Sequence, residues 1–296
     1  MTSRQGKTVP IITVLATLVI VWYAAAVWMN APFEQDKAAR GGHELSFTEL
    51  VSKTWAQNRP VIPAPHQVVQ EIYNTTVKKK ITSKRSLIFH SWITLSATLL
   101  GFLIGTILGI TLAIGIVHSR AMNISVMPWV ITSQTIPILA IAPMIIVVLN
   151  AVGISGLLPK ALISTYLSFF PVVVGMVKGL RAPDSAQLDL MYTYNASTWQ
   201  TFWKLRWPAS MPYLFTSLKV AIAISLVGAI VGELPTGAVA GLGARLLAGS
   251  YYGQTIQIWS ALFMAATLAA ILVMLVGFAH SYVLRRMGEK QEGALL

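Results

Sequence analysis

Long apolar runs recur along the chain, and they constrain its fold more than any other feature. The run from about Ser91 to Val117 holds no charged residue and exceeds the roughly 20 residues that an α-helix needs to cross a bilayer. The whole chain is 55% hydrophobic and 11% charged, whereas ordinary soluble domains contain about 25% charged residues. We therefore expect an all-α, polytopic membrane protein with about six transmembrane helices.

Six apolar segments are long enough to serve as spans. We place them at residues 10–29, 91–117, 127–149, 157–179, 210–232 and 255–284. Residues 30–89 form the longest polar interval, which we interpret as an external segment with an amphipathic helix. Residues 90–288 then form a core of five spans. Residues 1–9 and 289–296 are short polar tails.

Two of these spans carry internal signals. In the second, Gly101, Gly105 and Gly109 recur every four residues, a small-xxx-small pattern that lets helices approach closely. The third contains Pro137 and Pro143, which predict a kinked or broken helix because proline removes a backbone donor and clashes with the preceding turn. A membrane tolerates such a break where the freed carbonyl groups meet protein or water rather than lipid.

Lysine and arginine are unevenly distributed over the short connections between the spans. One set of connections, together with the tails, carries Arg4, Lys7, Arg120, Lys178, Arg181, Lys204, Arg206, Arg285, Arg286 and Lys290. The opposite short connections carry only Lys160 and Arg245. By the positive-inside rule, both termini and residues 183–208 face the cytoplasm. The net charge of +12 is thus an edge charge of the membrane spans and does not indicate nucleic-acid binding.

The interval between the fourth and fifth spans, residues 183–208, is rich in polar and aromatic residues. Asp184 is placed to cap a first helix that runs to about Tyr194. Asn195 follows where a left-handed residue would end that helix, since asparagine tolerates this conformation best after glycine. Ser197 begins an S-x-x-Q capping box, which predicts the start of a second helix.

The second helix is expected to end at Pro208, because proline cannot continue the backbone hydrogen bonds of a helix. It carries Trp199, Phe202, Trp203 and Trp207. Four aromatic residues are too many for a plain connecting segment.

The same interval resembles the "EAA" loop of binding-protein-dependent ABC transporter permeases, whose pattern is E-A-A-x-x-x-G-x9-I-x-L-P. The matching positions are Asp189, Leu190, Met191, Asn195, Leu205, Trp207 and Pro208. Several residue types differ from the pattern, while the spacing and the terminal proline agree with it. The resemblance implies a cytoplasmic coupling helix that docks into a groove of an ATPase subunit. We expect Asp189, Asn195, Trp199 and Trp203 to lie on or beside the docking surface. The alternative is an amphipathic helix at the membrane surface.

The wider resemblance is to the nitrate/sulfonate/taurine/bicarbonate-type branch of these permeases and covers about residues 60–288. It implies an importer in a bacterial cytoplasmic membrane, with two permeases, two ATPase subunits that bind the ATP, and a periplasmic or extracellular substrate-binding protein. Its substrate would be a small polar solute, such as an oxyanion, a sulfonate or a vitamin precursor. The second permease is either another copy or a paralogue, and the divergent loop favours the paralogue.

The resemblance also implies a translocation path lined by the broken third span. The candidate path residues are Gln134, Thr135, Pro137, Pro143, Lys219 and Glu233. A charge well inside a span, such as Lys219, should face protein or water. A packing kink, hydrogen bonds between helices, snorkelling of Lys219 and capping by Glu233 explain the same residues without transport.

Catalytic and metal-binding patterns do not accompany these features. The chain has no cysteine, its five histidines are scattered, and no acid pair or serine elbow lies in or beside a span. There is no Walker motif, so ATP would be bound by a partner, and the chain itself is expected to need no cofactor and no metal. We expect a transport subunit rather than an enzyme. An ion-coupled secondary transporter is the alternative, although such carriers usually have inverted halves and intramembrane acids.

Overall fold

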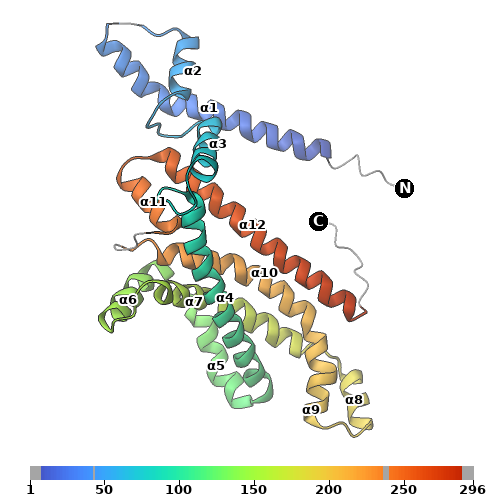
Figure 1. Cartoon of the computed structure of the whole chain (residues 1–296). Helices are drawn as coiled ribbons and strands as arrows, with labels where there is room; N and C mark the ends of the chain where they lie inside the picture. The colour runs from blue at the N-terminus through green and yellow to red at the C-terminus, as the bar shows by residue number, and fades with distance from the viewer. Residues whose placement is uncertain (1–7, 43, 236–239, 289–296) are drawn as a thin grey trace. The chain divides into compact units, whose positions relative to one another are not determined.

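The structure, a computed structural model, describes residues 8–42, 44–235 and 240–288 (Figure 1). Every regular element among these residues is helical, so the predicted all-α class is confirmed. The α-helices are α1 (Thr8–Arg40), α2 (Phe47–Trp55), α3 (Pro65–Tyr73), α4 (Leu87–His118), α5 (Arg120–Ser133), α6 (Ile138–Ala151), α7 (Leu157–Leu180), α8 (Ser185–Thr193), α9 (Thr198–Thr201), α10 (Trp207–Gly232), α11 (Leu242–Tyr251) and α12 (Thr255–Arg286), with π-helical turns η2 (Asn74–Lys78) and η3 (Phe202–Arg206).

The chain divides into two compact units. The first contains residues up to 90 together with 244–264, and the second contains residues 91–243 together with those from 265 onward. The C-terminal tail predicted at 289–296 and most of the N-terminal tail predicted at 1–9 lie outside the described residues.

Five helical runs of the described residues are long and apolar enough to cross a membrane. They are α1, α4, α7, the run Thr198–Gly232 that ends with α10, and α12. The pair α5 and α6 qualifies as a further candidate, although the two helices are bent by 99° at the break between them. The expected six spans are obtained when the bent pair counts as one.

The break between α5 and α6 falls inside the predicted third span and confirms that this span is interrupted. Pro137 directly precedes α6, with φ −61° and ψ 118°. Its ring removes a backbone donor and disfavours helical geometry in the residue before it. Pro143, in contrast, lies inside α6, so the break is due to Pro137 and not to both prolines.

The glycines of α4 allow it to approach α7 closely in the second unit. A Cβ atom added at Gly101 would lie 2.2 Å from the Cβ of Ser164, and one added at Gly105 would lie 2.2 Å from the Oγ of Ser168. No side chain fits at these distances, so the predicted small-xxx-small contact is confirmed.

Buried hydroxyl groups connect the same two helices to α10. Ser164 donates a hydrogen bond to the carbonyl of Ser225 at 2.6 Å, and Ser225 donates to the carbonyl of Thr98 at 2.9 Å. Lipid offers no hydrophobic driving force between helices, so close packing and such hydrogen bonds hold spans together. α4, α7 and α10 therefore form the interior of the second unit.

In the first unit, α1 extends beyond the expected end of its span at residue 29 and reaches Arg40. Its second half is stabilised by buried polar contacts with the segment that follows α2. Asn30 accepts a hydrogen bond from the N–H of Val61 at 2.7 Å and donates to the carbonyl of Ile62 at 2.9 Å. The polar residues after residue 29, from which we predicted the end of the span, therefore continue the helix.

A helix that sequence reasoning missed, α11, lies in the Gly-rich interval 233–254. Leu242 and Ala244 in its first turn are buried. This burial outweighs the low helix propensity of the neighbouring glycines, so the connection between the last two spans contains a helix of its own. Residues 236–239 of the interval lie outside the described residues.

Candidate functional site

The first helix of the 183–208 loop, α8, is capped by its own neighbours. The side chain of Asp184 accepts from the N–H of Gln187 at 2.7 Å, and the N–H of Asp184 donates to the side chain of Gln187 at 3.2 Å. These reciprocal bonds satisfy two backbone donors that the helix start leaves free. The predicted helix start is confirmed.

Asn195 ends α8 in the predicted left-handed conformation, with φ +51°. The N–H of Asn195 donates to the carbonyl of Tyr192 at 2.8 Å, and the N–H of Ala196 donates to that of Met191 at 3.0 Å. The chain thereby reverses and reaches Ser197, whose side chain caps α9 as the S-x-x-Q pattern predicted.

The predicted end of the second helix at Pro208 is wrong. α9 passes through η3 directly into α10, and the helical run continues through Pro208 and Pro212. The N–H of Trp207 donates to the carbonyl of Phe202, five residues earlier. The backbone hydrogen bonds have therefore changed from the α-helical to the π-helical pattern before the chain reaches Pro208. Pro208 then occupies the first turn of α10, where a missing N–H is tolerated. The loop is therefore continuous with the fifth span, without an intervening hinge.

Four aromatic side chains pack together along this continuous helix. The ring centroid of Trp203 lies 5.5 Å from that of Trp199, 5.1 Å from that of Phe202 and 5.4 Å from that of Trp207. Phe202 is buried and also contacts the ring of His118 on α4 at 5.3 Å. Phe202 thus anchors the cluster to the body of the second unit.

The outer surface of the loop exposes large apolar and aromatic side chains. The exposed fractions are 56% for Leu190, 86% for Tyr192, 77% for Tyr194, 69% for Trp199 and 45% for Trp203. We call these five residues the aromatic surface. Exposed large apolar side chains that gather on one segment are typical of interaction sites. Tyr192 and Tyr194 were missed because they lie between the positions of the motif, although their aromatic type was a usable signal.

The other residues of the predicted motif differ in exposure. Asp189 and Asn195 are exposed, whereas Met191, Leu205, Trp207 and Pro208 are half-buried. The half-buried residues therefore shape and support the loop rather than forming its outer surface.

A depression of about 360 Å³ lies beside the loop. It is lined by Val117, His118, Leu188, Tyr192, Ala196, Thr198, Thr201 and Arg206. Arg206 donates to the carbonyl of Leu180 at 2.9 Å, and Arg181 donates to the side chain of Asn123 at 3.0 Å. These bonds hold the base of the loop against α5 and α7, so that the depression has fixed walls.

The candidate path residues fall in separate places. Gln134, Thr135 and Pro137 lie in the break between α5 and α6, with Gln134 half-buried and the other two exposed, and Pro143 is exposed on α6. Lys219 lies on α10 beside α12, where a Cβ atom added at Gly277 would be 3.8 Å from its Cε. The break thus collects three of the candidates, Pro143 follows within α6, and the role of all of them in transport stays a prediction.

Glu233, the sixth path candidate, is the centre of a buried polar cluster at the end of α10. Its carboxylate has no exposed surface and accepts from the hydroxyl of Thr94 at 2.9 and 3.0 Å and from the N–H of Gly243 at 2.9 Å. The ammonium group of Lys160 lies 3.7 Å away. The N–H of Leu242 donates to Thr94 at 2.9 Å, so the cluster also holds the start of α11.

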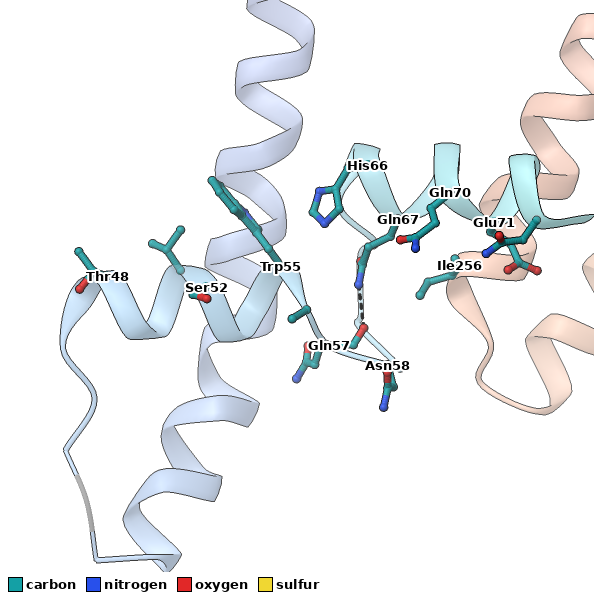
Figure 2. A pocket seen from close by; sticks show the side chains of 13 residues that line it. Thr48, Ser52, Trp55, Gln57, Asn58, His66, Gln67, Gln70, Glu71 and Ile256 are labelled. Atoms are coloured by element: carbon teal, nitrogen blue, oxygen red, sulfur yellow. Dashed lines mark hydrogen bonds between the residues drawn. The ribbon is translucent and has the colours of Figure 1, made fainter. Parts of the chain in front are cut away.

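In the first unit, a cavity of about 760 Å³ lies between α2, α3 and the start of α12 (Figure 2). The rings of Trp55 and His66 face each other edge-on at 6.5 Å, and the amide of Gln67 donates to the carbonyl of Gln57 at 2.9 Å. Its lining consists of aromatic, amide, hydroxyl and aliphatic groups with one carboxylate, Glu71. Across the described residues, no three His, Cys, Asp or Glu side chains are grouped to hold a metal ion.

Comparison with known proteins adds to this geometry. Residues 105–289 match the family described as "Binding-protein-dependent transport system inner membrane component". The chain is 29% identical to a probable ABC transporter permease protein of Haemophilus influenzae, over 77% of this chain and 88% of the relative. It is 32% identical to the formylaminopyrimidine transport permease protein ThiX of Halalkalibacterium halodurans, over 62% of this chain and 68% of the relative.

More distant relatives, 23% to 26% identical, are named as aliphatic sulfonate, nitrate and bicarbonate permeases. A solved structure of the MetNI methionine ABC transporter in an inward-facing conformation aligns with a TM-score of 0.55 and 20% identity, covering 68% of this chain and 95% of that one. This last similarity concerns the fold alone.

Proposed function

The chain belongs to the family of binding-protein-dependent transport system inner membrane components and is a permease subunit of an ABC importer, and from this premise we propose that residues 183–208 couple it to a separate ATPase subunit. The observation that carries the proposal is the aromatic surface, because exposed aromatic side chains are typical of the energetically important part of protein interfaces. Phe202 supports this surface from below, so its shape exists before the partner binds.

The continuous helix provides a route from the ATPase to the membrane. Because η3 joins α9 to α10 without a break, a displacement of the aromatic surface moves the start of α10 with it. α10 packs against α4 and α7 through the buried hydroxyl groups of Ser164 and Ser225. Movement at the loop is thereby transmitted to the interior of the second unit.

The proposed cytoplasmic position of the loop is supported by the number of crossings. A single cavity of the first unit is lined by Arg85, just before α4, and by Gln254, just before α12. α4 and α12 thus begin on the same side of the membrane, and an even number of crossings separates these starts. α4, α7 and α10 supply three of them, so the α5–α6 pair supplies a fourth. With α1 and α12 the chain crosses six times. Residues 183–208 follow the fourth crossing and so lie on the same side as both termini, which the positive-inside rule assigns to the cytoplasm.

The proposed substrate is a small polar solute, because the relatives are named for formylaminopyrimidine, sulfonates, nitrate and bicarbonate. The break between α5 and α6 supplies polar groups for its path at the depth of a span, where irregular backbone is tolerated only against protein or water. Gln134 and Thr135 are the side chains that we assign to this path, with Pro137 and Pro143 shaping it. Lys219 and Glu233, which pack within the second unit, are the remaining residues that we assign to the path.

The proposed partners are an ABC ATPase that binds the ATP, an external substrate-binding protein and a second permease. Coexpression of two differently tagged copies of the chain distinguishes a homodimer from a heterodimer with a paralogue. Recovery of one tag with the other indicates a homodimer. Recovery of a paralogue in place of the second tag supports the heterodimer that the divergent motif favours.

Gentle purification of the tagged chain from its native membrane tests the coupling proposal. We expect a P-loop ATPase to copurify with the wild-type chain, and Trp199→Ala with Trp203→Ala to reduce its recovery about tenfold or more. Trp28→Ala is the matched control, because Trp28 is 79% exposed but belongs to the first unit. Equal recovery with all variants would contradict the proposal. Transport in sealed vesicles without ATP, driven by an ion gradient, would instead support the secondary transporter.

A further inference from the structure

A second cavity of the first unit, about 710 Å³ in volume, has a lining that the transport function does not use. It lies between α3 and η2, the segment before α4, α11 and the start of α12. Its charged side chains are Lys78, Lys79, Arg85, Arg245 and Glu71. Four positive charges against one negative charge leave a net charge of +3 when all five groups are ionised. Such a concentration of one sign attracts a counter-ion.

Arg245 is the most enclosed of these cations. Its side chain is 15% exposed, and its guanidinium lies 4.0 Å from the carboxylate of Glu71, a long distance for a charged hydrogen bond. Its Nε has no hydrogen-bond partner among the described residues. Burial lowers the pKa of Arg245, an effect that Glu71 opposes and Arg85 reinforces. A guanidinium nevertheless stays charged in proteins, so Arg245 retains donors that no residue of the cavity satisfies.

Glu71 is the internal anion of the cavity and is itself unfavourably placed. Burial raises the pKa of Glu71, although Arg245 and Lys79 both lower it. One carboxylate therefore faces four cations from a partly buried position, and it cannot neutralise them. An external anion would complete the charge balance.

Neutral hydrogen-bond donors line the same cavity. They are the side chains of Asn74, Tyr252, Gln254 and Gln257. The amide of Gln257 donates to the carbonyl of Arg245 at 3.1 Å, which fixes α11 against the first turn of α12. Guanidinium, ammonium, amide and hydroxyl donors in one cavity are the groups that bind oxyanions.

The cavity lies where two membrane spans begin. Arg85 comes two residues before α4, and Tyr252 comes three residues before α12. The ammonium group of Lys78 lies 5.6 Å from the centre of the ring of Tyr73. Tyrosine and basic side chains at the ends of spans occupy the headgroup region of a membrane. An anion that is abundant at this depth is the phosphate of a lipid headgroup.

We propose that this cavity binds an oxyanion of the phosphate class, supplied by the headgroup of an anionic membrane lipid. Arg85 and Arg245 act as the charged donors, and Lys78 and Lys79 attract the anion to the cavity. Zwitterionic phosphatidylcholine carries the same phosphate beside a cation, which the positive lining repels. The volume suits a headgroup, since ligand pockets usually measure about 300–1,000 Å³. The site is separate from the coupling loop and does not rest on the proposed function.

Native mass spectrometry of the purified full chain tests the proposal. The chain in detergent is titrated with phosphatidylglycerol, with phosphatidylcholine, and with inorganic phosphate in a separate arm. We expect preferential binding of phosphatidylglycerol, weakened about tenfold in Arg85→Gln, because one charged hydrogen bond is lost. Glu71→Gln should strengthen binding, because it removes the competing internal anion. Arg85 is exposed, so its variant is expected to remain folded where an Arg245 variant need not.

The control is Lys53→Gln with Arg59→Gln, which removes charge from the first unit outside this cavity. If this control weakens lipid binding as much as Arg85→Gln does, or if the two lipids bind equally, the proposal is overturned. Displacement of phosphatidylglycerol by millimolar inorganic phosphate, with the same dependence on Arg85, would keep the oxyanion site and assign it to a soluble ion. Binding of neither lipid nor phosphate would overturn the site itself.

Discussion

The 183–208 loop and the Glu233 cluster are both polar regions at the end of a span, and they are built in opposite ways. In the loop, each helix cap is made by residues three positions apart, Asp184 with Gln187 and Ser197 with Gln200. In the cluster, Glu233 is bound by Thr94, 139 residues earlier in the chain. The loop therefore exposes its large side chains while keeping its own shape. In the cluster, Thr94 and Glu233 are fully buried and hold distant segments together.

This difference predicts where substitutions act. A change in the loop should alter partner binding and coupling with little effect on stability. A change in the cluster should alter stability first, because buried charges and donors lose partners that water cannot replace. Four substitutions test this contrast, from the largest expected effect to the smallest.

Glu233→Ala should give the largest loss. It leaves the ammonium group of Lys160, 13% exposed, without its carboxylate, and it removes the acceptor of the Gly243 N–H. Removing one partner of a buried ion pair lowers the free energy of unfolding by about 3–5 kcal/mol. Thermal unfolding of the purified chain measures this loss. The double variant Lys160→Met with Glu233→Leu should recover part of it, and Asp189→Ala on the loop should stay within about 0.5 kcal/mol of wild type.

Thr94→Val should give the next largest loss. The hydroxyl of Thr94 donates to Glu233 and accepts from the N–H of Leu242 at 2.9 Å, so valine leaves buried groups unpaired. The expected cost is about 1–3 kcal/mol. Thr193→Val is the matched control, since its exposed hydroxyl donates to the carbonyl of Asp189 at 2.9 Å and water can replace it. Equal stability of the two variants would contradict the distinction between the two regions.

Asn195→Val should separate coupling from stability. Asn195 has φ +51°, a conformation that a β-branched residue adopts only at a cost of about 1–2 kcal/mol. We expect the turn between α8 and α9 to distort and transport to fall, while the amount of inserted protein is unchanged. Transport and immunoblotting of the same membranes measure both. Asn195→Gly, which accepts this conformation freely, should transport normally, and normal transport by the valine variant would argue against the turn as a coupling element.

The two regions also differ in how far the sequence could predict them. Asp184, Asn195 and Ser197 act on the backbone within a few residues, so their roles follow from residue type and spacing. The pairing of Glu233 with Thr94 and Lys160 depends on how α4, α7 and α10 pack, and no local pattern relates those three positions. At Pro208 a local signal gave a wrong prediction. The residue type predicted a helix end, whereas the π-helical turn before Pro208 lets the helix continue.

Asp184→Ala should give the smallest effect and tests whether the loop keeps its own shape. Its side chain accepts from the N–H of Gln187 at 2.7 Å, and the loss of such a cap costs a helix about 1 kcal/mol. Because α8 has no buried residue to compensate, this cost should appear locally, as roughly fivefold faster hydrogen exchange of the α8 amides, with the global unfolding temperature unchanged. Ser185→Ala, one residue later, should leave that exchange unaltered. A drop in global stability on Asp184→Ala would mean that the loop is integrated with the interior as tightly as the Glu233 cluster is, and that its exposed surface is not energetically separate from the bundle it serves.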